Sequence, residues 1–199
     1  MNDNIGRRAG TTLVAGGIIY LLAEFIAAAA WTDPPYSYTY HFISDLGVHG
    51  PSTGFGQYMY SPLAWVMNAG FLLFALAALV GVALLRDRVA TALAVPLAAG
   101  MTLVALFPGS GEAIENGTAA YHGLGAFAAF ICGNILVMRL GRRWLGIVGL
   151  AGVVAFMVDM STGGILIGLI ERGAVYPVVF GLISVGLARR RVRPATVAA

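Results

Sequence analysis

Residues 13–31, LVAGGIIYLLAEFIAAAAW, form an apolar run in which Glu24 is the only charged side chain. A helix rises 1.5 Å per residue, so about twenty such residues cross a hydrocarbon core of about 30 Å. Similar runs recur along the chain at 62–85, 89–107, 119–138, 144–160 and 173–188. The sequence therefore predicts an all-α integral membrane protein, a six-transmembrane-helix bundle in a single membrane domain.

The composition agrees with a membrane protein and excludes an ordinary soluble domain. Hydrophobic residues make up 59% of the chain and charged residues 11%, whereas a soluble domain carries about 25% charged residues. The only cysteine, Cys132, leaves no partner for an intrachain disulfide. No clear cleavage site follows the first apolar run, so we expect a retained helix rather than a signal peptide.

All twelve basic residues are arginines, and their positions predict the orientation of the bundle. Eleven lie on one side of a six-span arrangement, and Arg172 lies on the other. Cytoplasmic loops are rich in basic residues, so both termini are expected in the cytoplasm and the loop 32–61 outside. This placement gives the arginines a topological role, and we expect no nucleic-acid partner. The Arg-only, Ala-rich composition is typical of high-GC bacteria, which predicts a bacterial cytoplasmic membrane.

The last apolar stretch, GGILIGLIERGAVYPVVFGLISVGLA at 163–188, is interrupted by Glu171, Arg172 and Pro177. Charged residues and proline are unfavourable inside a spanning helix. We therefore expect a short interfacial segment at 165–170, followed by a separate span from about Gly173.

Four spans place a polar side chain in the same outer layer: Glu24, Asn68, His122 and Asp159. An ionisable group at membrane depth is costly unless it is paired or hydrated, so each is a candidate site residue. Each also has a structural alternative. Asn68 would bridge helices by hydrogen bonding, and Asp159 would be an ordinary helix-end residue. Glu24 would bond a tyrosine or Arg172, and His122 the loop above it.

The loop 32–61 contains the stretch HFISDLG at 41–47, which predicts a short re-entrant or interfacial helix. His41 and Asp45 are four residues apart and would share one face of such a helix. Ser44 or Asp45 would cap a following turn, and Gly47 would end the segment. We therefore expect a structured loop that caps the outer mouth of the bundle.

Small residues indicate close helix packing. The chain contains 27 glycines, and Gly123, Ala126 and Phe130 lie along one stripe of the fourth span. We interpret this stripe as a packing surface. Small-residue faces of this kind would also allow the protein to form a homo- or hetero-oligomer.

Four short motifs carry a resemblance to a known family. They are ISDLG at 43–47, FP at 107–108, a histidine and alanine at His122 and Ala126, and GLIERGAVYP at 168–177. In order and spacing the chain resembles a prokaryotic six-span membrane family known as domain of unknown function 998. It is also distantly similar to the autophagy-modulator (DRAM) and Sfk families. That resemblance implies lipids as a theme and assigns no catalytic residue.

We therefore predict a polar site at the extracytoplasmic end of the bundle that binds or handles membrane lipid. A lipid head group would hydrogen-bond to the polar side chains there, and Arg172 would donate to a phosphate. The candidate ligand-binding residues are Glu24, His41, Ser44, Asp45, Asn68, His122, Asp159, Glu171 and Arg172.

Two alternatives remain open at this point. The first is a metal-dependent intramembrane lipid hydrolase or acyltransferase, with zinc held by His41, Asp45 and His122 together with Glu24 or Asp159. A variant of it uses Ser44 as a nucleophile activated by a histidine. The second is a non-enzymatic accessory or scaffold subunit whose polar cluster is purely structural. Transport is disfavoured, because the inner halves of the spans show no polar pathway.

Overall fold

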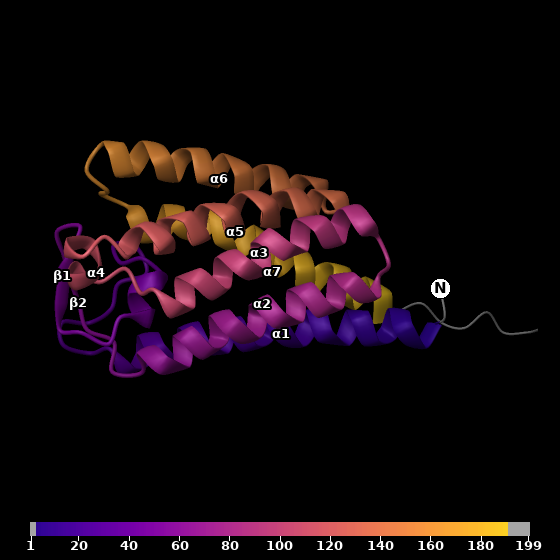
Figure 1. The fold of residues 1–199 in the computed structure, drawn as a ribbon, viewed down its shortest axis with the longest axis horizontal. Coiled ribbons are helices and arrows are strands. Elements are labelled where there is room, and N and C mark those ends of the chain that lie inside the picture. The colour runs from indigo at the N-terminus through magenta and orange to yellow at the C-terminus, as the bar shows by residue number, and fades with distance from the viewer. Residues whose placement is uncertain (1–2, 191–199) are drawn as a thin grey trace, which may run out of the picture.

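The computed structural model describes residues 3–190 as a single bundle of long, apolar helices (Figure 1). Within this range six helices are long and apolar enough to cross a membrane, which confirms the predicted all-α six-span fold. Their bounds are α1 Asp3–Ala30, α2 Ala64–Leu84, α3 Arg88–Leu106, α5 Ala119–Arg139, α6 Arg143–Ser161 and α7 Ile167–Arg190.

The helices follow one another around the bundle in the order α1, α2, α3, α5, α6 and α7, and α7 closes the ring against α1. Small residues allow the close approaches between them. A Cβ added at Gly100 of α3 would collide with the backbone of Gly125 of α5, and one at Gly152 of α6 would collide with Gly173 of α7. The glycines therefore serve packing inside this chain, as membrane helices commonly require.

The last span differs from the prediction, because α7 is one continuous helix from Ile167 to Arg190 that contains Glu171, Arg172 and Pro177. The two charged side chains are 5% and 6% exposed, and each bonds to protein groups described below. Pro177 removes the N–H that would donate to the Gly173 carbonyl, and Asn134 Nδ2 donates to the neighbouring Ala174 carbonyl at 2.9 Å. Neighbouring groups of this kind are what allow a proline or a charge within a spanning helix.

One end of the bundle carries the irregular segments, and we call it the loop end (Figure 1). It holds the 3₁₀ helix η1 Ser44–Gly47, the hairpin strands β1 Ser52–Gly54 and β2 Gln57–Met59, and the short helix α4 Gly111–Glu115. The N-terminus lies at the opposite end.

The loop between α1 and α2 is packed into the bundle mouth, which confirms that it is structured. Ile43, Leu46 and Val48 are at most 3% exposed. The Ser52 hydroxyl accepts a hydrogen bond from the Gly111 N–H at 2.8 Å and joins β1 to α4. Helical structure covers only η1, so His41 precedes the helix and does not share a helical face with Asp45.

Candidate functional site

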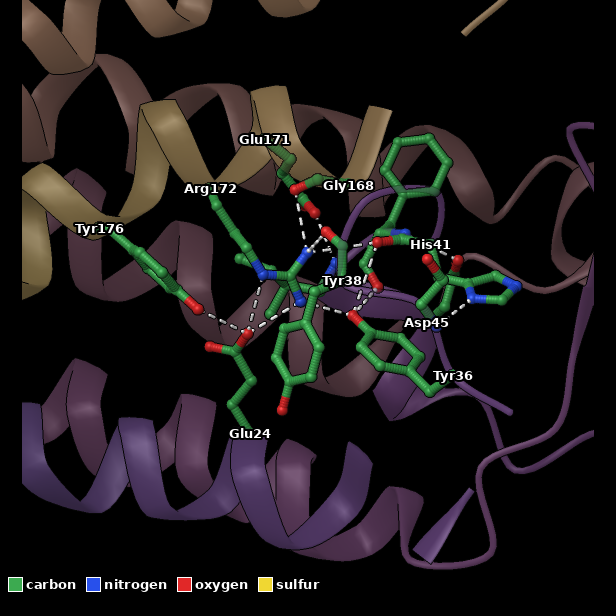
Figure 2. A network of polar contacts seen from close by, with 12 residues as sticks. Glu24, Tyr36, Tyr38, His41, Asp45, Gly168, Glu171, Arg172 and Tyr176 are labelled. Atoms are coloured by element: carbon green, nitrogen blue, oxygen red, sulfur yellow. Dashed lines mark hydrogen bonds and ion pairs between the residues drawn. The ribbon is translucent and has the colours of Figure 1, made fainter. Parts of the chain in front are cut away.

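Six of the nine predicted polar residues fall into two groups at the loop end. The first, the Arg172 cluster, consists of Glu24, Tyr36, Tyr38, Arg172 and Tyr176 (Figure 2). Arg172 Nε and Nη2 donate to Glu24 Oε1 at 3.1 and 2.9 Å, and the Tyr176 hydroxyl donates to the same oxygen at 3.0 Å. The pair is buried, with Glu24 1% exposed, and it joins α7 to α1.

The remaining donors of Arg172 hold the loop. Nη2 donates to the Tyr36 hydroxyl at 2.6 Å, and Nη1 donates to the carbonyls of Tyr38 and Gly168 at 2.8 and 2.9 Å. The guanidinium carbon also lies 4.7 Å from the centroid of the Tyr38 ring, within cation–π range. All five N–H groups of a guanidinium are thus used. In this structure Arg172 therefore leaves no guanidinium N–H without a protein partner.

His41 belongs to the folding of the loop itself. Its Nδ1 accepts a hydrogen bond from the Ser37 N–H at 2.9 Å, and its ring stacks on Tyr36 and lies against Trp31. Partial burial, and then the nearby Arg172, lower the pKa of His41. Because Nδ1 accepts a hydrogen bond, the ring is neutral in this role.

The second group surrounds a hollow of about 120 Å³, which we call the loop-end cavity. Its lining combines four polar residues with a wall of aromatic and small side chains. The lining residues are Phe42, Ser44, Asp45, Phe55, Gly109, Ala119, His122, Gly123, Ala126, Phe127, Phe130, Phe156, Met160 and Glu171. A narrow extension of about 20 Å³ continues past Ser44, His122 and Glu171 toward Tyr20 and Met101.

Two buried carboxylates form the polar wall of this cavity. Asp45 Oδ2 accepts a hydrogen bond from the Phe42 N–H at 2.9 Å, and Glu171 Oε2 accepts from the Ile43 N–H. Asp45 and Glu171 are 4% and 5% exposed. Among residues 3–190, no group donates to the second oxygen of either carboxylate. Burial, and then the charge of Glu171, raise the pKa of Asp45 well above its usual value.

His122 contributes a third polar atom from α5. Its Nδ1 lies 2.8 Å from the Phe107 carbonyl, which can only accept, so Nδ1 carries a proton. In the neutral ring Nε2 is then an acceptor. A Cβ at Gly109 would lie 3.6 Å from the ring, so the glycine keeps this side of the histidine uncovered.

Two other predicted residues lie outside the cavity. Asn68 Nδ2 donates to the Gly47 carbonyl at 3.0 Å, so this amide ties α2 to the end of η1. A Cβ at Gly47 would collide with Asn68 Oδ1, which explains the glycine there. Asp159 lies at the end of α6 and is absent from the cavity lining.

The predicted zinc ligands are not brought together. Within residues 3–190 no three His, Cys, Asp or Glu side chains are arranged to hold a metal ion. His41 is used within the loop, where its Nδ1 accepts from the Ser37 N–H. In the same range Ser44 donates no hydrogen bond to His122, the contact that an activated nucleophile needs.

Several important residues were missed or misread in the sequence. Asn134 on α5 is fully buried, and its Nδ2 bonds the carbonyls of Phe130 and Ala174. A single amide inside an apolar run was the available signal. Gly123, Ala126 and Phe130 lie along one stripe of α5, as expected, but this stripe faces the cavity as well as packing the bundle.

Comparison with known proteins identifies the family. The family model described as "Protein of unknown function (DUF998)" matches residues 14–188, so the chain belongs to this family. No curated protein and no solved structure matches it. The motifs noted in the sequence meet at the loop end: ISDLG forms η1, Phe107 bonds His122, and Glu171 and Arg172 bond the loop.

Proposed function

We propose that this DUF998 protein binds a membrane amphiphile, a lipid or lipid-derived molecule, in the loop-end cavity. The observation that carries the proposal is the mixed lining of the cavity. Aromatic rings from the loop, α5 and α6 line it together with the polar side chains of Asp45, His122 and Glu171. A mostly apolar pocket with a few convergent polar groups is the usual form of a small-molecule site.

The surroundings of the cavity support a ligand with an apolar chain. A shallower hollow of about 220 Å³, between the loop and the end of α6, shares Phe42, Phe55 and Met160 with the cavity. Large apolar side chains beyond it are exposed, including Ile165 at 71% and Leu169 at 54%. On a spanning protein these side chains face the lipid, so a chain leaving the cavity on this side enters the membrane without crossing polar surface.

The Arg172 cluster gives the site a fixed cover. Its bonds to the Tyr36 hydroxyl and the Tyr38 carbonyl attach the loop to α7 within one turn of Glu171. A rigid supporting shell of this kind holds binding groups in place. The proposal therefore assigns the cluster to support and the cavity to binding.

The test is to fill the cavity and measure the lipid that remains bound. A Cβ at Gly123 meets no heavy atom within 4 Å, so Gly123→Leu adds a side chain to the hollow without a backbone clash. We expect most of the lipid that co-purifies with the wild type to be lost in this variant, as measured by native mass spectrometry.

Ala120→Leu is the matched control, because Ala120 lies on the same helix, is exposed and does not line the cavity. It should retain the lipid of the wild type. Equal lipid content in Gly123→Leu and Ala120→Leu would contradict the proposal.

We also propose that the loop end faces away from the cytoplasm of a bacterial cell. Of the ten arginines in residues 3–190, nine lie at or near the opposite end, which supports this orientation through the positive-inside rule. In a Cys132→Ala background, Asn116→Cys should react with a membrane-impermeant maleimide in intact cells. Arg88→Cys should react only after lysis, and the reverse pattern would invert the orientation.

A scaffold or accessory role without a ligand is the second candidate. The observation that favours it is the full use of the Arg172 guanidinium, which fixes the loop without needing any bound molecule. Under this function Gly123→Leu leaves the activity of any partner complex unchanged. Small-residue helix faces would then provide the contacts for a homo- or hetero-oligomer.

A further inference from the structure

We infer that the polar group held in the loop-end cavity is a hydrogen-bond donor without negative charge, a hydroxyl or an amine, and that an anionic phosphate is excluded. The inference rests on the proposed function, because it names the class of amphiphile that the same cavity accepts. It is carried by the polar residues that line the cavity. Asp45, Glu171 and His122 line it, and no positively charged side chain does.

Three free side-chain atoms of the wall are acceptors when the two carboxyl groups are ionised, and the Ser44 hydroxyl, which also lines the cavity, can donate or accept. Asp45 and Glu171 each use one oxygen on a backbone N–H of the loop, which leaves Asp45 Oδ1 and Glu171 Oε1. His122 presents Nε2 as an acceptor, because Nδ1 carries the proton toward the Phe107 carbonyl. A hydroxyl or an amine satisfies such atoms, whereas a phosphate oxygen brings only further lone pairs.

No positive charge balances these carboxylates within the cavity. No arginine lines it, and the chain has no lysine. Arg172 follows Glu171 directly, but successive residues of a helix point about 100° apart. Its donors are consumed by Glu24, Tyr36 and the loop carbonyls.

Four backbone N–H groups near the cavity already have acceptors. The N-terminus of α5 reaches the cavity at Ala119, and a helix N-terminus is a common anion site when its N–H groups are free. Here the N–H groups of Ala120 and Tyr121 already donate to the carbonyls of Gly117 and Thr118. The N–H groups of Phe42 and Ile43 are used by the two carboxylates.

Burial of the two carboxyl groups strengthens the preference for an amine or a hydroxyl over a phosphate. When Asp45 and Glu171, which are 4% and 5% exposed, are ionised, their charges are poorly screened and repel a third negative charge beside them. An amine is attracted by the same field, and a hydroxyl is hydrogen-bonded without a charge penalty. The predicted order of affinity is amine and hydroxyl well above phosphate.

The experiment compares three amphiphiles with the same chain. Full-length protein in phosphatidylcholine nanodiscs is titrated at pH 7 with hexadecylamine, hexadecanol or hexadecyl phosphate, and Gly123→Leu is titrated in parallel to subtract partitioning into the bilayer. We expect the amine and the alcohol to bind about tenfold or more tightly than the phosphate. Equal or tighter binding of the phosphate overturns this inference and leaves the proposed function standing.

If none of the three binds above the Gly123→Leu background, the proposed function itself fails. Glu171→Gln tests the origin of the preference, because the amide oxygen can still accept from the Ile43 N–H while the charge is removed. It should lower the ratio of the amine affinity to the phosphate affinity by about tenfold. Asp45→Asn should do the same if Glu171→Gln does not fold. Asp159→Asn, a carboxylate outside the cavity, should leave the ratio unchanged, and an equal effect in Asp159→Asn overturns the inference.

Discussion

Glu171 and Arg172 are adjacent in the sequence and buried to the same extent, yet they belong to opposite kinds of site. Arg172 lies in a cluster where every donor of its guanidinium has a partner. Glu171 uses one oxygen on the loop and presents the other to a cavity. A buried polar group whose hydrogen-bonding atoms all have protein partners is structural, whereas one with an atom left open to a cavity can bind a ligand, whatever its charge or depth.

The largest loss of stability should follow from removing Arg172 from the Arg172 cluster. Arg172→Met leaves the Glu24 carboxylate buried without its cation, and loss of one partner of a buried ion pair costs about 3–5 kcal/mol. We expect this variant to show the largest fall in the unfolding midpoint in detergent, measured by thermal unfolding.

The matched control is Glu24→Gln combined with Arg172→Met, which removes both charges. It should recover much of the lost stability, because the uncompensated buried charge is gone. If Arg172→Met were as stable as the wild type, the cluster would not be structural.

An intermediate effect on stability should come from the titration of Asp45, which makes the stability depend on pH. Burial and the charge of Glu171 raise the pKa of Asp45 above 3.8, its ordinary value, while the Phe42 N–H and Arg172 act in the opposite direction. The folded protein then binds a proton more readily than the unfolded chain, so stability falls as pH rises from about 4 through the raised pKa.

Asp45→Asn should flatten this pH dependence, because the amide cannot titrate and its oxygen can still accept from the Phe42 N–H. The measurement is the unfolding midpoint across pH 4 to 9, with Asp159→Asn as the control. A steeper slope in Asp45→Asn would show that the sign of the pKa shift is wrong.

The smallest effect should come from an exposed ion pair. Arg139 and Asp87 are 3.0 Å apart, with side chains 49% and 30% exposed. Such pairs contribute little, because water and salt screen them. Arg139→Ala should therefore leave the unfolding midpoint unchanged, in contrast to Arg172→Met. A comparable loss in both variants would mean that burial does not distinguish the two arginines.

Much of the fold follows from local sequence properties. The apolar runs are as long as a membrane is thick, so all six spans were predicted. The four middle spans begin and end within two residues of their predicted bounds, and the first ends within one residue of its predicted end. The sixth was misjudged, because the cost of Glu171, Arg172 and Pro177 depends on partners elsewhere in the chain. Ile43, Tyr38 and Asn134 supply those partners, and their positions become known only when the loop and α5 are placed.

The sequence predicted only that the candidate site residues lie at the same depth, at one end of the bundle. The sequence placed Glu24, His122 and the loop residue Asp45 at the same end of the bundle, since depth follows from the rise of a helix. It did not show which of them belong to the Arg172 cluster and which line the cavity, because residue spacing does not set the direction of a loop side chain. His41 and Asp45 looked like one helical face, yet the helix begins at Ser44 and His41 points into the stack with Tyr36.

The sequence by itself determined that this chain is a six-span membrane bundle of the DUF998 family with its polar residues gathered at one end. Apolar length, helical rise and ordered motifs are local properties, so the sequence carries them directly. Only the tertiary structure decided which polar residues are satisfied and which face a cavity. That division depends on hydrogen bonds between residues such as Glu24 and Arg172, far apart in the chain, and on the space that side chains leave between helices.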